Sequence, residues 1–123
     1  MIRIVGVQRS DRVGQEFVLL QNQGSMRARL RGHAVVAEVA LEDSEPLRAF
    51  HFFAEDADVL PGQYVLLRTC PGEPHTGRTT DGHQIFYAYM NRMTPVWNEA
   101  RGAVHVLGTL HSHVERNCEL LLV

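Results

Sequence analysis

The chain has 123 residues, of which 45% are hydrophobic and 21% charged, and its net charge is −2. This length and composition predict one soluble globular domain, residues 1–123, that folds without a stabilising disulfide or metal, and they exclude disorder over most of the chain. The small negative charge excludes a general attraction to nucleic acid.

The N-terminal residues 1–7 form an apolar run that is too short for the core of a signal peptide, and Arg3 interrupts it. No segment approaches the length of a membrane span. We therefore expect a cytoplasmic protein without a membrane partner. In that compartment Cys70 and Cys118 are expected to stay separate thiols rather than form a disulfide.

Short runs rich in Val, Leu, Phe and Tyr alternate with turn signals along the chain. No window of ten or more residues has the 3.6-residue apolar period of a helix. This pattern predicts an all-β chain. The expected strands are residues 2–8, 16–22, 26–30, 33–41, 47–53, 63–69, 84–90, 103–107, 110–114 and 119–123.

The segment Leu60-Pro61-Gly62 is the strongest turn signal. Proline fixes φ near about −65°, and glycine accepts the positive φ that a type II turn requires. The chain is therefore expected to reverse here between an aromatic strand and an apolar strand, as at the corner of a β-sandwich. Further turns are expected at residues 22–24 and 42–46 and at Gly108-Thr109, which has the Gly-X form of a two-residue hairpin.

Two connections, residues 71–83 and 91–102, are longer than hairpins require. The first is polar throughout and is expected to be highly mobile. The second contains Trp97, which is expected to fold back and close one end of the fold, with its indole N–H bonded to a carbonyl. Much of the core is assigned to six aromatic residues: Phe17, Phe50, Phe52, Tyr64, Phe86 and Trp97.

Three segments follow one another in an order typical of a known module: residues 17–24, then residues 50–69 with the Leu-Pro-Gly corner, then residues 96–98. Together they resemble the lamin tail domain. The family's strand ending in Asn-x-Gly matches Asn22 and Gly24, its Leu-x-Gly-Trp matches residues 30–32, and its Trp-Asn looks like Trp97-Asn98. His33 stands where that family usually has tryptophan.

The resemblance covers about residues 5–115 and implies an immunoglobulin-like antiparallel β-sandwich. The family occurs at the tail of nuclear lamins and, in bacteria, as an accessory module of otherwise unrelated proteins. Because the family has no shared active site, the resemblance supplies no catalytic residue. It implies a binding or spacer role.

Arg27, Arg29 and Arg31 alternate with apolar residues, so a strand would place the three guanidinium groups on one face. The apolar residues are Met26, Ala28 and Leu30. Such an arginine stripe could hold the phosphates of a nucleic acid weakly. It is equally typical of an edge strand that is kept charged so that other sheets do not pair with it, which is the interpretation we favour.

Seven histidines suggest a metal site, and His111 and His113 share one face of the expected strand 110–114. Across the expected hairpin their neighbours are Val106 and Val104, so this face supplies no third ligand. Two histidines on a half-exposed strand are therefore the simpler interpretation.

A metal-dependent or thiol-dependent enzyme is the competing hypothesis, with His75, His83 and Asp81 in the long polar connection and Cys70 as the nucleophile. No motif supports this set, so no catalytic residue, metal or cofactor is assigned. Residues 55–58 form an acidic turn that lacks the glycine and loop of a dedicated calcium site.

The chain ends in four consecutive apolar residues within 119–123. Such a segment is expected to pair inside the fold or with a second copy, which gives a monomer or a homodimer through the C-terminal strand. The sequence as a whole favours a non-enzymatic interaction module with an unidentified protein partner.

Overall fold

The computed structural model describes residues 1–38, 49–100 and 102–108. The elements in these ranges are ten β-strands and one short 3-10 turn, Val13–Gln15, which confirms the all-β prediction. The strands are β1 Ile2–Gln8, β2 Phe17–Asn22, β3 Ala28–Arg29, β4 Ala34–Ala37, β5 Phe50–Phe52, β6 Asp58–Val59, β7 Tyr64–Arg68, β8 His75–Arg78, β9 Gln84–Tyr89 and β10 Val104–Leu107.

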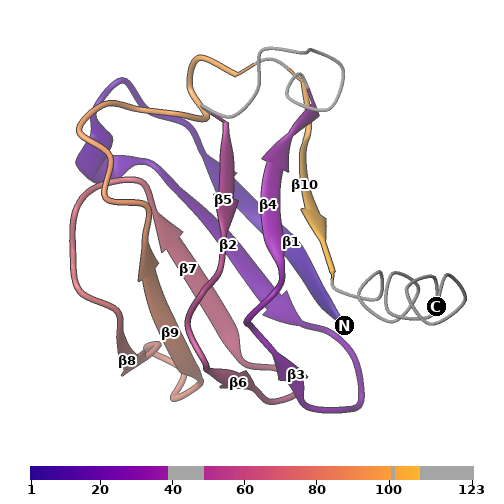
Figure 1. Ribbon diagram of the computed structural model, residues 1–123. Coiled ribbons are helices and arrows are strands. Elements are labelled where there is room, and N and C mark those ends of the chain that lie inside the picture. The colour runs from indigo at the N-terminus through magenta and orange to yellow at the C-terminus, as the bar shows by residue number, and fades with distance from the viewer. Residues whose placement is uncertain (39–48, 101, 109–123) are drawn as a thin grey trace, which may run out of the picture.

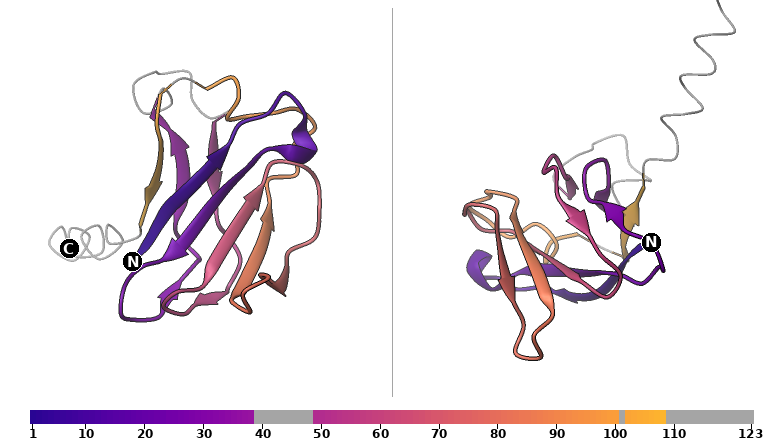
Figure 2. Two further views of the ribbon diagram at one scale, coloured as in Figure 1. Left: turned by 180° about the vertical axis from the view of Figure 1, so that it is seen from behind. Right: turned by 90° about the horizontal axis from the view of Figure 1, so that it is seen from below.

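The strands form three sheets (Figure 1): a five-stranded sheet in the order β1-β2-β7-β9-β8, a three-stranded sheet in the order β10-β4-β5, and the pair β3-β6. The three-stranded sheet lies over one face of the five-stranded sheet (Figures 1 and 2). Neighbouring strands are antiparallel except β7 and β9. The expectation of antiparallel pairing fails there because β8 comes between β7 and β9 along the chain and runs antiparallel to β9, so β9 repeats the direction of β7.

The core lies between the two larger sheets and is built by period-2 alternation. β2 and β7 bury every second residue, whereas all four residues of β4 are buried. The largest fully buried side chains include Trp97 and Phe53. The prediction that six aromatic residues supply much of the core is wrong for Phe52, whose side chain is 57% exposed. Four of the other expected core aromatics are only half-buried: Phe17, Phe50, Tyr64 and Phe86.

The aromatic run of β5 shows why Phe52 is outside. Phe50 and Phe52 pack edge to face on the outer side, with ring centroids 5.7 Å apart, while His51 and Phe53 meet at 5.0 Å on the other side. Two side chains that are two residues apart share a face of a strand. Burial of Phe53 therefore fixes the register and leaves Phe52 in solvent.

The connection over residues 71–83 is a β-hairpin rather than the mobile loop that its polarity suggested. β8 pairs with β9, and the turn is closed by the Thr79 N–H donating to the His83 carbonyl at 2.8 Å. Gly82 has φ +84°, a conformation that glycine adopts without steric cost. Asp81-Gly82 is the Asp-Gly pair that typically forms a two-residue hairpin turn, so the sequence contained a signal that could have predicted this turn.

The corner at Leu60-Pro61-Gly62 is confirmed. The Gln63 N–H donates to the Leu60 carbonyl at 3.0 Å, and Gly62 has φ +86°, as a type II turn requires. The strand that enters the corner is the two-residue β6, which the sequence did not reveal, and the strand that leaves it is β7 in the five-stranded sheet.

Asn22 fixes the end of the fold next to this corner. Its buried side-chain oxygen accepts hydrogen bonds from the Met1 amino group and the Gly24 N–H, and its amide donates to the carbonyls of Met26 at 2.9 Å and Val59 at 2.8 Å. All four hydrogen-bonding positions of the amide are used. One side chain thus ties β2 to β6 and to the segment that leads into β3.

Glu16 fixes the opposite end. Its carboxylate is fully buried and accepts three hydrogen bonds, from the Thr69 hydroxyl at 2.8 Å and from the backbone N–H groups of Val96 at 2.8 Å and Asn98 at 2.7 Å. Arg9 adds a hydrogen bond to the Trp97 carbonyl at 3.0 Å. The segment that carries Trp97 is therefore held next to the start of β2 by hydrogen bonds to the backbone of residues 96, 97 and 98.

Trp97 is fully buried in the core, as expected for a residue that closes one end of the fold. The prediction for its indole N–H is wrong, because Nε1 has no hydrogen-bond partner in the described part of the chain. Apolar packing of the ring, together with the hydrogen bonds to the backbone around it, decides its position.

Several expectations lie outside the described residues. They are the strands 110–114 and 119–123, the turn 42–46, the inner ends of the expected strands 33–41 and 47–53, the second residue of the Gly108-Thr109 turn, His111, His113 and Cys118.

We predict that Glu16→Gln lowers the free energy of unfolding by about 2 to 4 kcal/mol, because an amide NH₂ would face buried N–H or O–H donors. Urea unfolding followed by tryptophan fluorescence measures the loss. Glu73→Gln removes the same charge from an exposed residue and is expected to change stability little. Equal stability of the two variants would contradict the role of Glu16.

We predict that Gly62→Ala lowers the free energy of unfolding by about 1 kcal/mol, from backbone strain alone. A Cβ at Gly62 meets no atom within 4 Å, so crowding plays no part. Gly14 has equally open surroundings without a positive φ, so Gly14→Ala is the matched control and is expected to be neutral or slightly stabilising. Equal effects in urea unfolding would mean that the corner is not constrained.

Candidate interaction site

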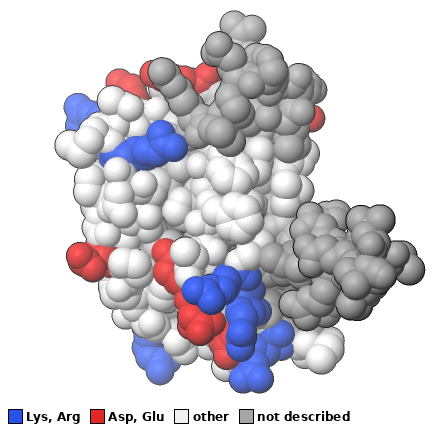
Figure 3. Space-filling view, viewed as in Figure 1, with Lys and Arg blue, Asp and Glu red and all other residues white. Residues whose placement is uncertain are grey.

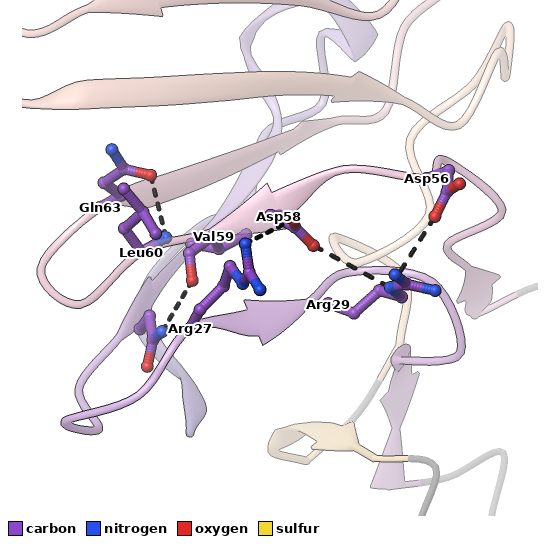
Figure 4. Close-up of polar contacts among 8 residues, drawn as sticks. Arg27, Arg29, Asp56, Asp58, Val59, Leu60 and Gln63 are labelled. Carbon is purple, nitrogen blue, oxygen red and sulfur yellow. Dashed lines mark hydrogen bonds and ion pairs between the residues drawn. The ribbon is translucent and has the colours of Figure 1, made fainter.

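The arginine stripe lies in and beside β3, which pairs with β6 at the lower end of the molecule in Figure 1. Figure 4 shows Arg27 and Arg29 there. Arg27, Arg29 and Arg31 are all exposed. The expected apolar face is present at Ala28, which is half-buried, and at Leu30, which is fully buried, but Met26 is 77% exposed. Met26 departs from the alternation because the strand begins only at Ala28.

Aspartates of the acidic turn lie opposite the arginines. Arg27 is 3.6 Å from Asp58, and Arg29 is 3.9 Å from both Asp56 and Asp58. Figure 3 shows basic and acidic atoms side by side at this end of the face. The arginine side chains are about two-thirds exposed, so each pair adds little stability. The aspartates nevertheless reduce the positive charge that the stripe offers to a phosphate.

A pocket of about 230 Å³ opens beside Asp58, between β6 and the strands β7, β9 and β8. Its lining residues are Ala57, Asp58, Val59, Gln63, Tyr64, Thr76, Gln84 and Phe86. Gln63 is fixed at its rim, because its Oε1 accepts from the Leu60 N–H at 2.9 Å and its Nε2 donates to Gln84 Oε1 at 3.0 Å. The pocket is thus partly apolar, with amide, hydroxyl and carboxylate groups around it.

The strand next to this pocket, β8, is the last strand of the five-stranded sheet. Thr79 and His83 form a hydrogen-bonded pair, and such pairs alternate along an antiparallel ladder. The register then directs the backbone N–H and C=O groups of Thr76 and Arg78 away from β9. No described strand pairs with these groups, so they form an open hydrogen-bonding edge within the described part of the chain. Thr76, which carries two of the groups, also lines the pocket.

The sequence analysis missed this edge and the pocket. The Asp81-Gly82 turn signal could have revealed β8, because a hairpin turn there requires a strand before it. The pocket has no such signal, since its lining comes from residues in and around the four successive strands β6 to β9, which only folding brings together.

The loop histidines of the enzyme hypothesis pack on aromatic rings. His75 stacks on Tyr87 with ring centroids 4.5 Å apart, and His83 meets Tyr64 edge to face at 6.0 Å. Cys70 is a half-buried free thiol. In the ranges that the structure describes, no three His, Cys, Asp or Glu side chains gather so that they could hold a metal ion.

His105 lies 3.7 Å from Glu38, between Nε2 and Oε1. The same Nε2 is buried and has no hydrogen-bond partner among the described residues. The contact is therefore too long for a hydrogen bond, and His105 at most forms an ion pair when it is protonated.

Among the histidines that the structure describes, His51 is the one whose pKa its surroundings clearly shift. Burial lowers its pKa from the ordinary value of 6.5; the charge of Glu55 raises the pKa and that of Arg92 lowers it further. His51 Nε2 and Glu55 Oε2 are both buried without a hydrogen-bond partner in the described ranges. His51 is consequently held neutral on the inner side of β5 rather than poised as a charged ligand.

The chain matches no protein-family model, no curated protein and no solved structure. The described residues include no helix with the length and apolar character needed to cross a membrane.

We predict that the pKa of His51 lies below 6.5, with burial as the main cause. Because the unfolded chain then binds the proton more readily, this residue makes stability fall as the pH is lowered through 6.5. Glu55→Gln is expected to lower the pKa of His51 further, whereas Asp56→Asn, the matched control, is expected to leave it unchanged. NMR titration of the histidine ring protons measures both, and a pKa at or above 6.5 in the unmodified protein would contradict the burial of His51.

Proposed function

We propose that this chain is an immunoglobulin-like β-sandwich of the lamin-tail type that acts as a non-enzymatic interaction module in the cytoplasm. Its partner would be a protein with an extended segment that adds to the edge of β8. The observation that carries this proposal is the open backbone edge of Thr76 and Arg78 beside a pocket.

The sandwich assignment is supported by the single core cluster, which takes residues from the five-stranded and the three-stranded sheets. Residues behind the resemblance also occupy constrained positions. Asn22 is fully hydrogen-bonded, Gly32 has φ +88°, and Trp97 is fully buried. His33 is half-buried, and its Nδ1 lies 3.3 Å from the Leu30 carbonyl.

Strand addition uses backbone hydrogen bonds for affinity and side-chain pockets for specificity. A segment beside β8 would bond to the outward groups of Thr76 and Arg78. One of its side chains could then enter the pocket next to Thr76, whose volume of about 230 Å³ is below the range of typical small-molecule sites. Because Asp58 at the pocket is already paired with Arg27 and Arg29, an uncharged side chain fits best.

The thiol or metal enzyme is the weaker proposal. Stacking on Tyr87 occupies the His75 ring, and edge contact with Tyr64 orients His83. Weak nucleic-acid binding through Arg27, Arg29 and Arg31 is likewise disfavoured by the neighbouring aspartates. Neither arrangement offers the convergent polar groups that catalysis or phosphate binding needs.

We predict that short peptides selected from a random phage-displayed library bind the β8 edge. Thr76→Pro removes an outward N–H donor without removing a bond to β9, and it is expected to weaken peptide binding at least about tenfold in calorimetry. Thr80→Pro, within the hairpin turn, is the matched control and should bind as the unmodified protein does. Hydrogen exchange should slow at the amides of Thr76 and Arg78 when a peptide is bound. Peptides that bind Thr76→Pro with unchanged affinity would overturn the proposal.

A further inference from the structure

The two residues of β8 that carry the outward backbone groups also share one face of the strand. Thr76 pairs with Phe86 and Arg78 pairs with Gln84, and side chains two residues apart point to the same side of a strand. Thr76, Gln84 and Phe86 line the pocket. The side chain of Arg78 therefore lies on the face of the hairpin on which the pocket opens.

The open edge of β8 is short, and its ends are defined by residue type. Pro74, immediately before the strand, has no N–H to donate. His75 and Gly77 alternate with the outward residues, so their backbone groups are directed toward β9. Within β8, a donor and an acceptor thus face outward together only at Thr76 and Arg78. An extended segment that adds to this edge is aligned by these two residues.

Arg78 places an exposed positive charge at this edge. A guanidinium carries several N–H donors, and one nitrogen of Arg78, Nη1, donates to the Gly82 carbonyl at 3.0 Å. Arg27 and Arg29 lie beside aspartates, whereas no ion pair joins Arg78 to a carboxylate among the described residues. The charge of Arg78 is therefore presented to a segment that pairs with β8.

The pocket has room for one aromatic ring. Its volume of about 230 Å³ exceeds that of a cavity of roughly 150 Å³ that holds benzene in another protein. The lining includes Tyr64 and Phe86, and aromatic rings favour offset or edge-to-face contact with one another. Residues opposite each other on neighbouring strands have Cβ atoms about 5 Å apart, within reach of an aromatic side chain. A ring opposite Thr76 can therefore extend over this small residue into the pocket.

We propose that the partner's segment adds antiparallel to β8 and carries an acidic residue two positions before an aromatic residue. The acidic residue pairs with Arg78, and the aromatic residue pairs with Thr76 and fills the pocket. Antiparallel pairing is slightly more stable per residue than parallel pairing, and it places the acidic residue first along the partner. This inference rests on the strand addition proposed above and adds the chemistry of the partner.

The two side-chain contacts contribute in different ways. Opposite charges across neighbouring strands stabilise the pair modestly, and like charges destabilise it, so Arg78 mainly selects against basic segments. The aromatic ring removes apolar surface from water in the pocket, so it supplies more of the affinity. Backbone hydrogen bonds to Thr76 and Arg78 add affinity that depends little on the partner's sequence.

Peptides selected on the unmodified protein from the random phage-displayed library are the probes, and they are expected to share the acidic-x-aromatic pattern. Replacing the aromatic residue with alanine is expected to weaken binding at least about tenfold in calorimetry, and replacing the acidic residue with lysine about fivefold. NMR contacts between the peptide ring and the Thr76 methyl group are expected to locate the ring at the pocket.

Arg78→Glu tests the charge from the side of the protein. It is expected to invert the preference, so that the lysine peptide binds more tightly than the acidic one. Arg78→Gln is the second variant, which keeps a side-chain donor for the Gly82 carbonyl and is expected to abolish the preference. Arg12→Glu makes the same charge change at an exposed residue before the Val13–Gln15 turn and, as the matched control, should keep the preference. Slow hydrogen exchange at the Thr79 amide, which closes the hairpin turn, shows that each variant retains β8.

The outcomes separate this inference from the strand addition itself. Selected peptides that slow hydrogen exchange at Thr76 and Arg78 but lack the acidic-x-aromatic pattern would overturn the inference alone. A charge preference that is unchanged in both Arg78→Glu and Arg78→Gln would do the same. Peptides that leave exchange at these two amides unchanged, or a library that yields no binder, would overturn the strand addition as well.

Discussion

The buried carboxylate of Glu16 is the interaction on which the arrangement of the core depends. Removing a carboxylate from water costs several kcal/mol unless donors replace the water, and here the donors are the Thr69 hydroxyl and two backbone N–H groups near residue 97. The carboxylate thereby fixes a segment that would otherwise be a long irregular connection. That constraint holds Trp97 in the core, where its own indole N–H makes no hydrogen bond in the described part of the chain.

Asn22 performs the corresponding task at the other end, where one side-chain amide joins β2, β6 and the start of the chain. The pocket lies beside the Asn22 end of the molecule, next to Val59 and Gln63, and the edge of β8 adjoins it. The proposed interaction with a partner rests on these two features.

Local patterns in the sequence were sufficient to predict the strands with long apolar runs. They also predicted the turn at Gly62, because a positive φ and a fixed proline φ are properties of single residues. They were insufficient for β6, which has only two residues and forms by pairing with β3. β8 has no apolar run, and the Asp81-Gly82 turn was the one local signal for it. Local patterns also misplaced Phe52, since an aromatic run with Phe at 50, 52 and 53 fits either register until the core selects one. For the candidate site, the sequence identified the arginines but not their aspartate partners.

By itself, then, the sequence determined an all-β chain, the corner at residues 60–62 and the exposure of Arg27, Arg29 and Arg31, because each follows from residue type and a period of two. Only the tertiary structure decided that Glu16 anchors residues 96–98 and that apolar rows line one face of the five-stranded sheet. These features join residues that are distant along the chain. The free energy of such contacts exists only once folding brings the partners together, so no local pattern records it.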